Sequence, residues 1–258
     1  AISISPFDGS RDTLTIDRPL TNLIVMSTSH IGFLDALDAL DCISGVSGKD
    51  FVFQSQKVLA SRPSTPSDWN KMKTIVDVGY DAAPDYETIM ALKPDLLLTY
   101  AVSGAKTSFV SKLEQLGIPV FIVNEHLESH PLARAAYVRL FGALTGEMEA
   151  ADSVLAAVRS NYVSLADSVS SSGSSVRKVL LNIPYNDQWF VPSRESYLTA
   201  MIRDAGGSVL GSEPGRAASS VMSLEKAYSL SKEADCWLNT GWCQTMKQLL
   251  GVNPLFED

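Results

Sequence analysis

Two histidines stand four residues apart between positions 125 and 130, with a glutamate near each of them. On a helix, His126 and His130 would share one face, and Glu125 and Glu128 would add carboxylate oxygens. Imidazole and carboxylate groups at this spacing could hold a metal ion. However, Pro131 follows His130 directly, and the two histidines lie away from the loops that follow the expected strands. We therefore keep metal binding as an alternative and expect no resident metal or other cofactor.

Catalytic chemistry is not indicated by the remaining residues. Ser29 and His30 are adjacent in the sequence, and neighbouring side chains seldom face each other as a nucleophile and its base must. The sequence contains no GxSxG, GxGxxG, P-loop or HExxH motif. We predict that the protein is not an enzyme.

Short apolar runs alternate with amphipathic stretches along the chain. Runs that follow one another in this way predict parallel strands joined by right-handed helical crossovers, an α/β fold. Strands are expected at about 23–26, 43–46, 95–100, 120–123, 178–183, 208–210 and 235–239, and helices at about 31–40, 85–92, 105–116 and 131–144.

A long helix is predicted over residues 146–172, where apolar residues keep a spacing of three to four until a serine-rich stretch. The pattern of strand, polar loop, helix and strand then begins again. In each half a capped helix with an early glutamate is followed by a strand that opens with aspartate. The matching residues are Asp85, Glu87 and Asp95 in the first half, and Ser223, Glu225 and Asp235 in the second. We expect two similarly folded lobes joined by one rigid helix.

A ligand is expected at the carboxyl ends of the parallel strands, where open α/β sheets bind their ligands. The loops there are rich in aromatic residues, which suit a large, flat and partly apolar ligand. Arg194, at an expected helix start, could meet an anionic group of such a ligand. With it, the predicted ligand-contacting residues are Ser29, His30, Phe51, Tyr80, Tyr100, Tyr185, Trp189 and Trp242.

Several segments, in order along the chain, resemble the substrate-binding proteins of siderophore, haem and cobalamin ABC importers. They are STSHIGFLDAL at 27–37, DYETIMALKPDLLL at 85–98, LGIPV at 116–120 and LTG at 144–146 before the long helix. The second half fits this family less tightly, but in the same order. The resemblance covers about residues 20–258.

The resemblance implies a class III periplasmic binding protein fold, with a ligand held between two lobes. The implied ligand is an iron complex, either a siderophore or haem, and the alternatives are cobalamin or the zinc and manganese bound by related proteins. The resemblance also implies that Glu87 and Glu225 dock with an ABC transporter permease. A monomer in the periplasm, or anchored outside the cytoplasmic membrane, is expected.

The expected domains are an N-terminal arm at 1–19, a first lobe at 20–145, the linking helix at 146–172 and a second lobe at 176–258. The family continues beyond the last strand predicted here, so we expect the second lobe to be incomplete, and the start carries no signal peptide. A net charge of −8 without basic clusters argues against nucleic acid as a partner. Cys42 and Cys236 are predicted to be buried, and pairing of Cys236 with Cys243 stays open.

Overall fold

The computed structural model describes residues 2–4, 14–50, 52, 74–101, 107–185, 188–215, 219–241 and 243–256. The chain divides into two compact units. The first unit comprises Ala1–Asn124 and Ala136–Ala157, and the second comprises Glu125–Ala135 and Val158–Asp258. A short antiparallel pair, β1 (Ile2–Ile4) and β2 (Leu14–Ile16), begins the first unit.

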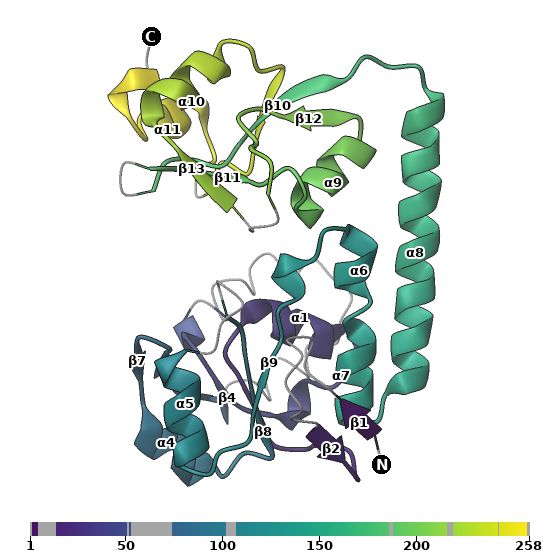
Figure 1. Cartoon of the computed structure of the whole chain (residues 1–258), viewed down its shortest axis with the longest axis vertical. Helices are drawn as coiled ribbons and strands as arrows, with labels where there is room; N and C mark the ends of the chain where they lie inside the picture. Colours follow the sequence, from purple (N-terminus) through teal and green to yellow (C-terminus); the bar gives the residue numbers. More distant parts are fainter. Residues whose placement is uncertain are drawn as a thin grey trace. The chain divides into compact units, whose positions relative to one another are not determined.

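The first unit is built on a five-stranded sheet with the order β5-β4-β3-β8-β9, in which every pairing is parallel (Figure 1). The prediction of a parallel α/β sheet is thereby confirmed. The central strands are buried throughout, because helices cover both faces of the sheet. The strands are β3 (Leu23–Val25), β4 (Ile43–Val46), β5 (Val76–Asp77), β8 (Leu96–Thr99) and β9 (Val120–Ile122).

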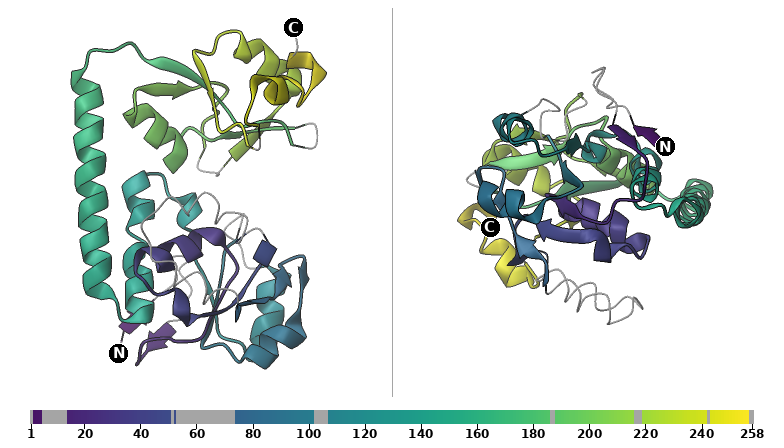
Figure 2. Two further views of the ribbon diagram at one scale, coloured as in Figure 1. Left: turned by 180° about the vertical axis from the view of Figure 1, so that it is seen from behind. Right: turned by 90° about the horizontal axis from the view of Figure 1, so that it is seen from below.

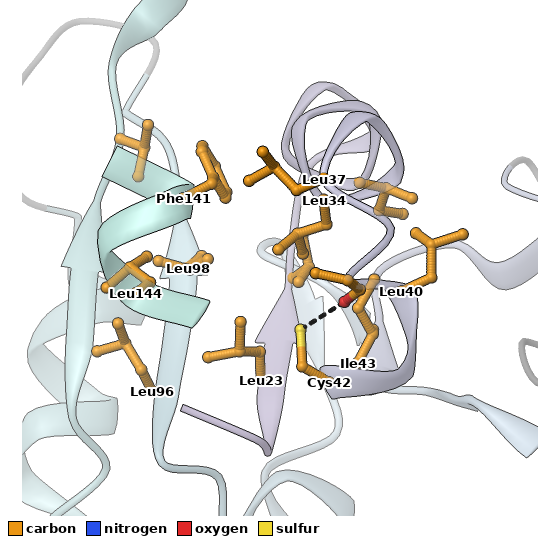
Figure 3. Close-up of a cluster of buried hydrophobic side chains, with 14 of the residues drawn as sticks. Leu23, Leu34, Leu37, Leu40, Cys42, Ile43, Leu96, Leu98, Phe141 and Leu144 are labelled. Carbon is orange, nitrogen blue, oxygen red and sulfur yellow. Dashed lines mark hydrogen bonds between the residues drawn. The ribbon is translucent and has the colours of Figure 1, made fainter. Parts of the chain in front are cut away.

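Two apolar clusters lie on opposite faces of this sheet. Alternate residues of one strand divide between them: Leu23 belongs to the first cluster and Ile24 to the second. Figure 3 shows the first cluster, which α1 (Thr28–Ala36) and α7 (Val138–Thr145) cover with Leu34 and Phe141. The second cluster packs under α4 (Tyr86–Leu92) and α5 (Ser108–Gln115). Between the strands lie η1 (Leu40–Cys42) and a hairpin of β6 (Gly79–Tyr80) and β7 (Ala83–Pro84).

The second unit contains a three-stranded parallel sheet with the order β12-β10-β14. A separate antiparallel pair, β11 with β13, was not expected from the sequence. The strands are β10 (Arg177–Leu181), β11 (Trp189–Pro192), β12 (Gly207–Val209), β13 (Ser219–Met222) and β14 (Cys236–Leu238). The helical elements are η3 (Glu125–Leu127), α6 (Pro131–Ala135), α9 (Tyr197–Asp204), α10 (Leu224–Ser231), α11 (Met246–Leu250) and η4 (Pro254–Phe256).

The internal repeat extends to individual hydrogen bonds. In the first unit the Asp95 carboxylate accepts a bond from the Asn22 N–H (3.1 Å), and the Asp95 N–H donates to the Asn22 carbonyl (2.8 Å). In the second unit Asp235 makes the same two bonds with Lys178, at 2.7 and 2.9 Å. The Asp95 carboxylate also pairs with Arg18 at 2.6 Å. The aspartate that opens each strand therefore fixes the register of two neighbouring strands.

The long helix predicted over 146–172 is confirmed as α8 (Met148–Ser171), a single 24-residue helix seen from two sides in Figures 1 and 2. Its residues up to Ala157 belong to the first unit and those from Val158 to the second. The segment Glu125–Ala135, which precedes α7, packs with the second unit, where the Arg134 guanidinium lies 4.6 Å from the centre of the Tyr197 ring. Within the described part of the chain, no helix has the length and apolar character needed to cross a membrane.

Two of the cysteine predictions are decided by burial. Cys42 is buried, and its thiol donates to the Ala39 carbonyl at 2.8 Å (Figure 3). The prediction for Cys236 was wrong, because β14 is the outer strand of the described sheet and leaves this side chain exposed. Cys236 and Cys243 are free thiols in this structure.

Candidate functional site

The carboxyl edge of the first unit's sheet carries two of the predicted ligand contacts at its topological switch point. The chain runs from β3 outward to β4 and β5, and it then returns to the other side of β3 with β8 and β9. Ligands of such sheets bind where this direction reverses, here between β3 and β8. Ser29 lies in the first turn of α1, directly after β3. Tyr100 follows β8, and its side chain is 37% exposed.

Tyr80 lies at the same edge of the sheet, on the β6–β7 hairpin that follows β5. The Asp77 carboxylate accepts bonds from the N–H groups of Lys49 (2.8 Å) and Gly79 (2.9 Å), which joins the loops after β4 and β5. Gly48 has a φ of +64°, and a Cβ built there would lie 2.9 Å from the Tyr80 ring. The ring is 48% exposed. Tyr80 is therefore seated against the Gly48 backbone with about half of its surface available to a ligand.

Two predicted contacts, His30 and Trp189, belong instead to the hydrophobic cores. His30 is 0% exposed, on the inner face of α1, and its ring lies 5.7 Å from that of Phe141. Trp189 is also 0% exposed, and its indole N–H donates to the Leu181 carbonyl at 2.8 Å. The sequence suggested a polar loop at Trp189, but this residue begins β11, which turns the ring inward. Both side chains are therefore buried in this structure.

The remaining predicted contacts differ in their exposure. Tyr185 follows β10 and is 68% exposed, at the carboxyl edge of the second unit's sheet. Arg194 is exposed in the turn between β11 and α9, where its backbone N–H donates to the Glu213 carbonyl at 2.9 Å. Phe51 and Trp242 lie outside the described residues.

Sequence reasoning missed two asparagines at the carboxyl edge of the second unit's sheet. Asn182 follows β10 and Asn239 follows β14, and both have a left-handed backbone, with φ of +71° and +56°. The Asn239 side-chain NH₂ donates to the Asn182 side-chain oxygen at 2.5 Å. An asparagine directly after each apolar run was the available signal, because asparagine tolerates the left-handed region better than most residues.

Glu87 and Glu225 occupy equivalent positions in the two units. Each is exposed at the second residue of its helix, α4 or α10. The caps are equivalent too: Asp85 accepts from the Thr88 N–H (3.0 Å), and Ser223 accepts from the Lys226 N–H (3.2 Å). The backbone N–H of Glu225 itself, followed by the Ser223 hydroxyl, lowers the pKa of the Glu225 carboxyl. The two caps hold both helix starts in the same way and leave both carboxylates exposed.

The two histidines considered for metal binding do not share a helical face. His126 lies in η3 and His130 directly precedes α6. The His130 Nδ1 accepts from the Leu132 N–H at 3.1 Å, and its ring meets the Tyr162 ring edge-on at 5.9 Å. Over the residues that the structure describes, no group of three or more His, Cys, Asp or Glu side chains is placed to hold a metal ion.

The fold and the sequence together place the chain in a known class. The sequence profile of the periplasmic binding proteins matches residues 23–258. The chain therefore belongs to the periplasmic binding protein family, whose members bind solutes and are not enzymes. An uncharacterised lipoprotein of Methanocaldococcus jannaschii, MJ0878, is 26% identical to it over 254 residues. That match covers 94% of this chain, which spans 57% of the length of its relative.

Solved structures share the fold over most of the chain. A periplasmic binding protein from Veillonella parvula superposes with a TM-score of 0.71 at 16% identity, covering 100% of this chain and 87% of its own. FhuD from Vibrio cholerae, bound to Fe³⁺-Desferal, gives 0.65 at 17% identity, covering 92% and 84%. MolA from Haemophilus influenzae, bound to molybdate, gives 0.65 at 18% identity, covering 85% and 69%. At these identities the likeness shows the fold alone, which is the two-lobed class III fold with one long helix.

Proposed function

We propose that this protein delivers a bulky iron complex, a siderophore or haem, to an ABC importer outside the cytoplasm. One observation carries the choice of ligand: exposed tyrosines follow parallel strands at the carboxyl edges of both sheets. Tyr80 and Tyr100 lie in the first unit and Tyr185 in the second. Aromatic rings of this kind offer broad apolar contact together with a polar hydroxyl, which suits a large chelate better than a small ion.

Proteins of this fold bind ligands of different sizes, such as molybdate and Fe³⁺-Desferal, and exposed tyrosine rings favour the larger ones. A molybdate ion is small and anionic, so it would gain little from broad ring faces. Cobalamin is bulky and partly apolar and remains the alternative within the proposed class. Ser29 and Arg194, both at least partly exposed, are the polar groups that we propose for contact with the same ligand.

Alanine substitution of the tyrosines tests this proposal. Tyr80→Ala, Tyr100→Ala and Tyr185→Ala should each weaken binding of ferric desferrioxamine or haem by about twofold to tenfold, because each ring contributes about 0.5–1.5 kcal/mol. Titration calorimetry measures the affinities. Tyr228→Ala is the control, because Tyr228 lies on α10 and its ring packs against that of Phe256 in η4. Unchanged affinity in all three variants would refute the proposed site.

We also propose that Glu87 and Glu225 dock with arginines of the permease. This proposal is supported by their equivalent exposure, one on each unit. Glu87→Lys and Glu225→Lys should reduce stimulation of the cognate permease–ATPase complex in proteoliposomes and leave ligand affinity unchanged. Glu149→Lys is a matched control, because Glu149 is also an exposed acidic residue in the first turn of a helix, α8. Equal loss with the control, or loss of ligand affinity, would contradict the docking role.

A further inference from the structure

The described residues include four non-glycine residues with a left-handed backbone, and two of them do not lie at the end of a helix. Asp38 follows α1 and Lys93 caps α4, positions where helices commonly end in this conformation. Asn182 and Asn239 instead follow parallel strands. Left-handed backbone disfavours residues that carry a Cβ, and such strain is often kept at functional sites.

The two asparagines lie at the switch point of the second unit. In the sheet order β12-β10-β14, they follow the two strands between which the chain direction reverses. Met26 is the counterpart of Asn182 in the first unit. The Met26 N–H donates to the Leu98 carbonyl (2.9 Å), just as the Asn182 N–H donates to the Leu238 carbonyl (3.0 Å). Met26 has no left-handed backbone. The strained turn is therefore a property of this site and not of the fold.

A chain of hydrogen bonds fixes the orientation of both side-chain amides. The Asn182 NH₂ donates to the Phe190 carbonyl at 2.7 Å. Since a carbonyl only accepts, the NH₂ must face Phe190, and the Asn182 side-chain oxygen must face Asn239. Asn239 must then turn its own NH₂ toward Asn182, as the 2.5 Å bond shows. The exposed Asn239 side chain is left with its oxygen as a free acceptor, which has no hydrogen-bond partner among the described residues.

We propose that the Asn239 side-chain oxygen accepts a hydrogen bond from an N–H or O–H group of the ligand, and that Asn182 is the residue that positions it. The ligand class is then a complex with hydrogen-bond donors on its periphery, such as the amide N–H groups of a hydroxamate siderophore. A bare oxyanion such as molybdate offers acceptors only and is disfavoured at this position. The inference rests on the proposed function and adds the chemistry of the ligand's outer surface.

Asn239→Gly tests the inference without endangering the fold. Glycine adopts φ near +56° freely, so relief of backbone strain should offset the lost hydrogen bond and leave Tm within about 2 °C of the wild type. Affinity for ferric desferrioxamine should fall about fivefold to tenfold, because an oriented acceptor is lost. Lys93→Gly is the matched control, since it relieves the same kind of strain at a helix end, and it should leave affinity unchanged.

Asn182→Gly tests the positioning role, because glycine adopts a φ near +71° and removes the side-chain oxygen that accepts from Asn239. The double variant with Asn239→Gly should bind no more weakly than Asn239→Gly alone. Wild-type affinity in Asn239→Gly, or additive losses in the double variant, would overturn this inference and leave the proposed function standing. If the wild type binds molybdate and no metal complex, the proposed function fails, and the inference fails with it.

Discussion

Gly48→Ala is the sharpest perturbation of the first unit's candidate site. The added Cβ would lie 2.9 Å from the Cε1 and Oη atoms of Tyr80, well inside van der Waals contact. Because the tyrosine ring is about half exposed, the ring is expected to move and the backbone to stay. Gly48 also has a φ of +64°, so alanine there costs about 1–2 kcal/mol of folding free energy from backbone strain alone.

Gly117→Ala separates the two effects. Gly117 lies in the same unit with a φ of +75°, but nothing lies within 4 Å of a Cβ built there. Both variants should therefore lose a similar free energy of unfolding, measured by urea denaturation. Only Gly48→Ala should displace Tyr80, and it should weaken binding of ferric desferrioxamine by about twofold to tenfold, the contribution of one aromatic contact.

Titration calorimetry of Gly48→Ala and Gly117→Ala with ferric desferrioxamine distinguishes displacement of the Tyr80 ring from general destabilisation. Equal affinities for Gly48→Ala and the wild type would refute the role given to Tyr80. An equal loss of affinity in Gly117→Ala would show that general destabilisation, and not the displaced ring, weakens binding. The Tyr80→Ala, Gly48→Ala double variant should bind like Tyr80→Ala alone, because the ring that alanine displaces is already absent.

Three further predictions concern the scaffold. Burial raises the pKa of the Asp95 carboxyl, but its bonds to Arg18 and to backbone N–H groups lower that pKa more, so the net shift is downward. The charged carboxylate therefore stabilises the folded protein above the ordinary carboxyl pKa, and this stabilisation is lost as the pH falls through the lowered pKa. Asp95→Asn should therefore lower the free energy of unfolding at pH 7, measured in urea, by about 1–2 kcal/mol, and the difference between variant and wild type should shrink as the pH falls below the ordinary carboxyl pKa. Trp189→Phe should lower the free energy of unfolding by about 1–3 kcal/mol, because the Leu181 carbonyl loses its bond from the indole N–H, and it should leave ligand affinity unchanged. A loss of affinity without a loss of stability would instead support a ligand contact by Trp189. Burial raises the pKa of Cys42 to about 12, so Ellman's reagent should modify Cys236 rapidly and Cys42 only on unfolding, and fast reaction of both would contradict the packing of Cys42.

Much of the scaffold could be predicted because its signals are local. Apolar runs such as 96–98 are buried on both faces, and so they are recognisable without knowledge of their partners. The capped helices that carry Glu87 and Glu225 were also readable, because caps follow from adjacent residue types. By contrast, β11 and β13 are separated by about 30 residues in the sequence, and no local sequence pattern predicts that they pair.

The candidate site was only partly predictable, because the side of an element that a ring faces depends on tertiary packing. Tyr80 and Tyr185 are exposed as a ligand contact requires, whereas His30 and Trp189 turn into the cores. Their positions in the sequence gave no sign of this difference, since all four follow or begin short strands or helices. The hydrogen-bonded amides of Asn182 and Asn239 lie 57 residues apart in the sequence and meet only because β10 pairs with β14.

Native mass spectrometry of the purified protein against ferric desferrioxamine, haem, cobalamin, Zn²⁺ and molybdate tests the central claim most directly. A binding protein for a bulky iron complex should take up one ferric siderophore or haem per chain, saturably and without turning it over. Binding of Zn²⁺ or molybdate alone, with none of the complexes retained, would contradict the proposed function.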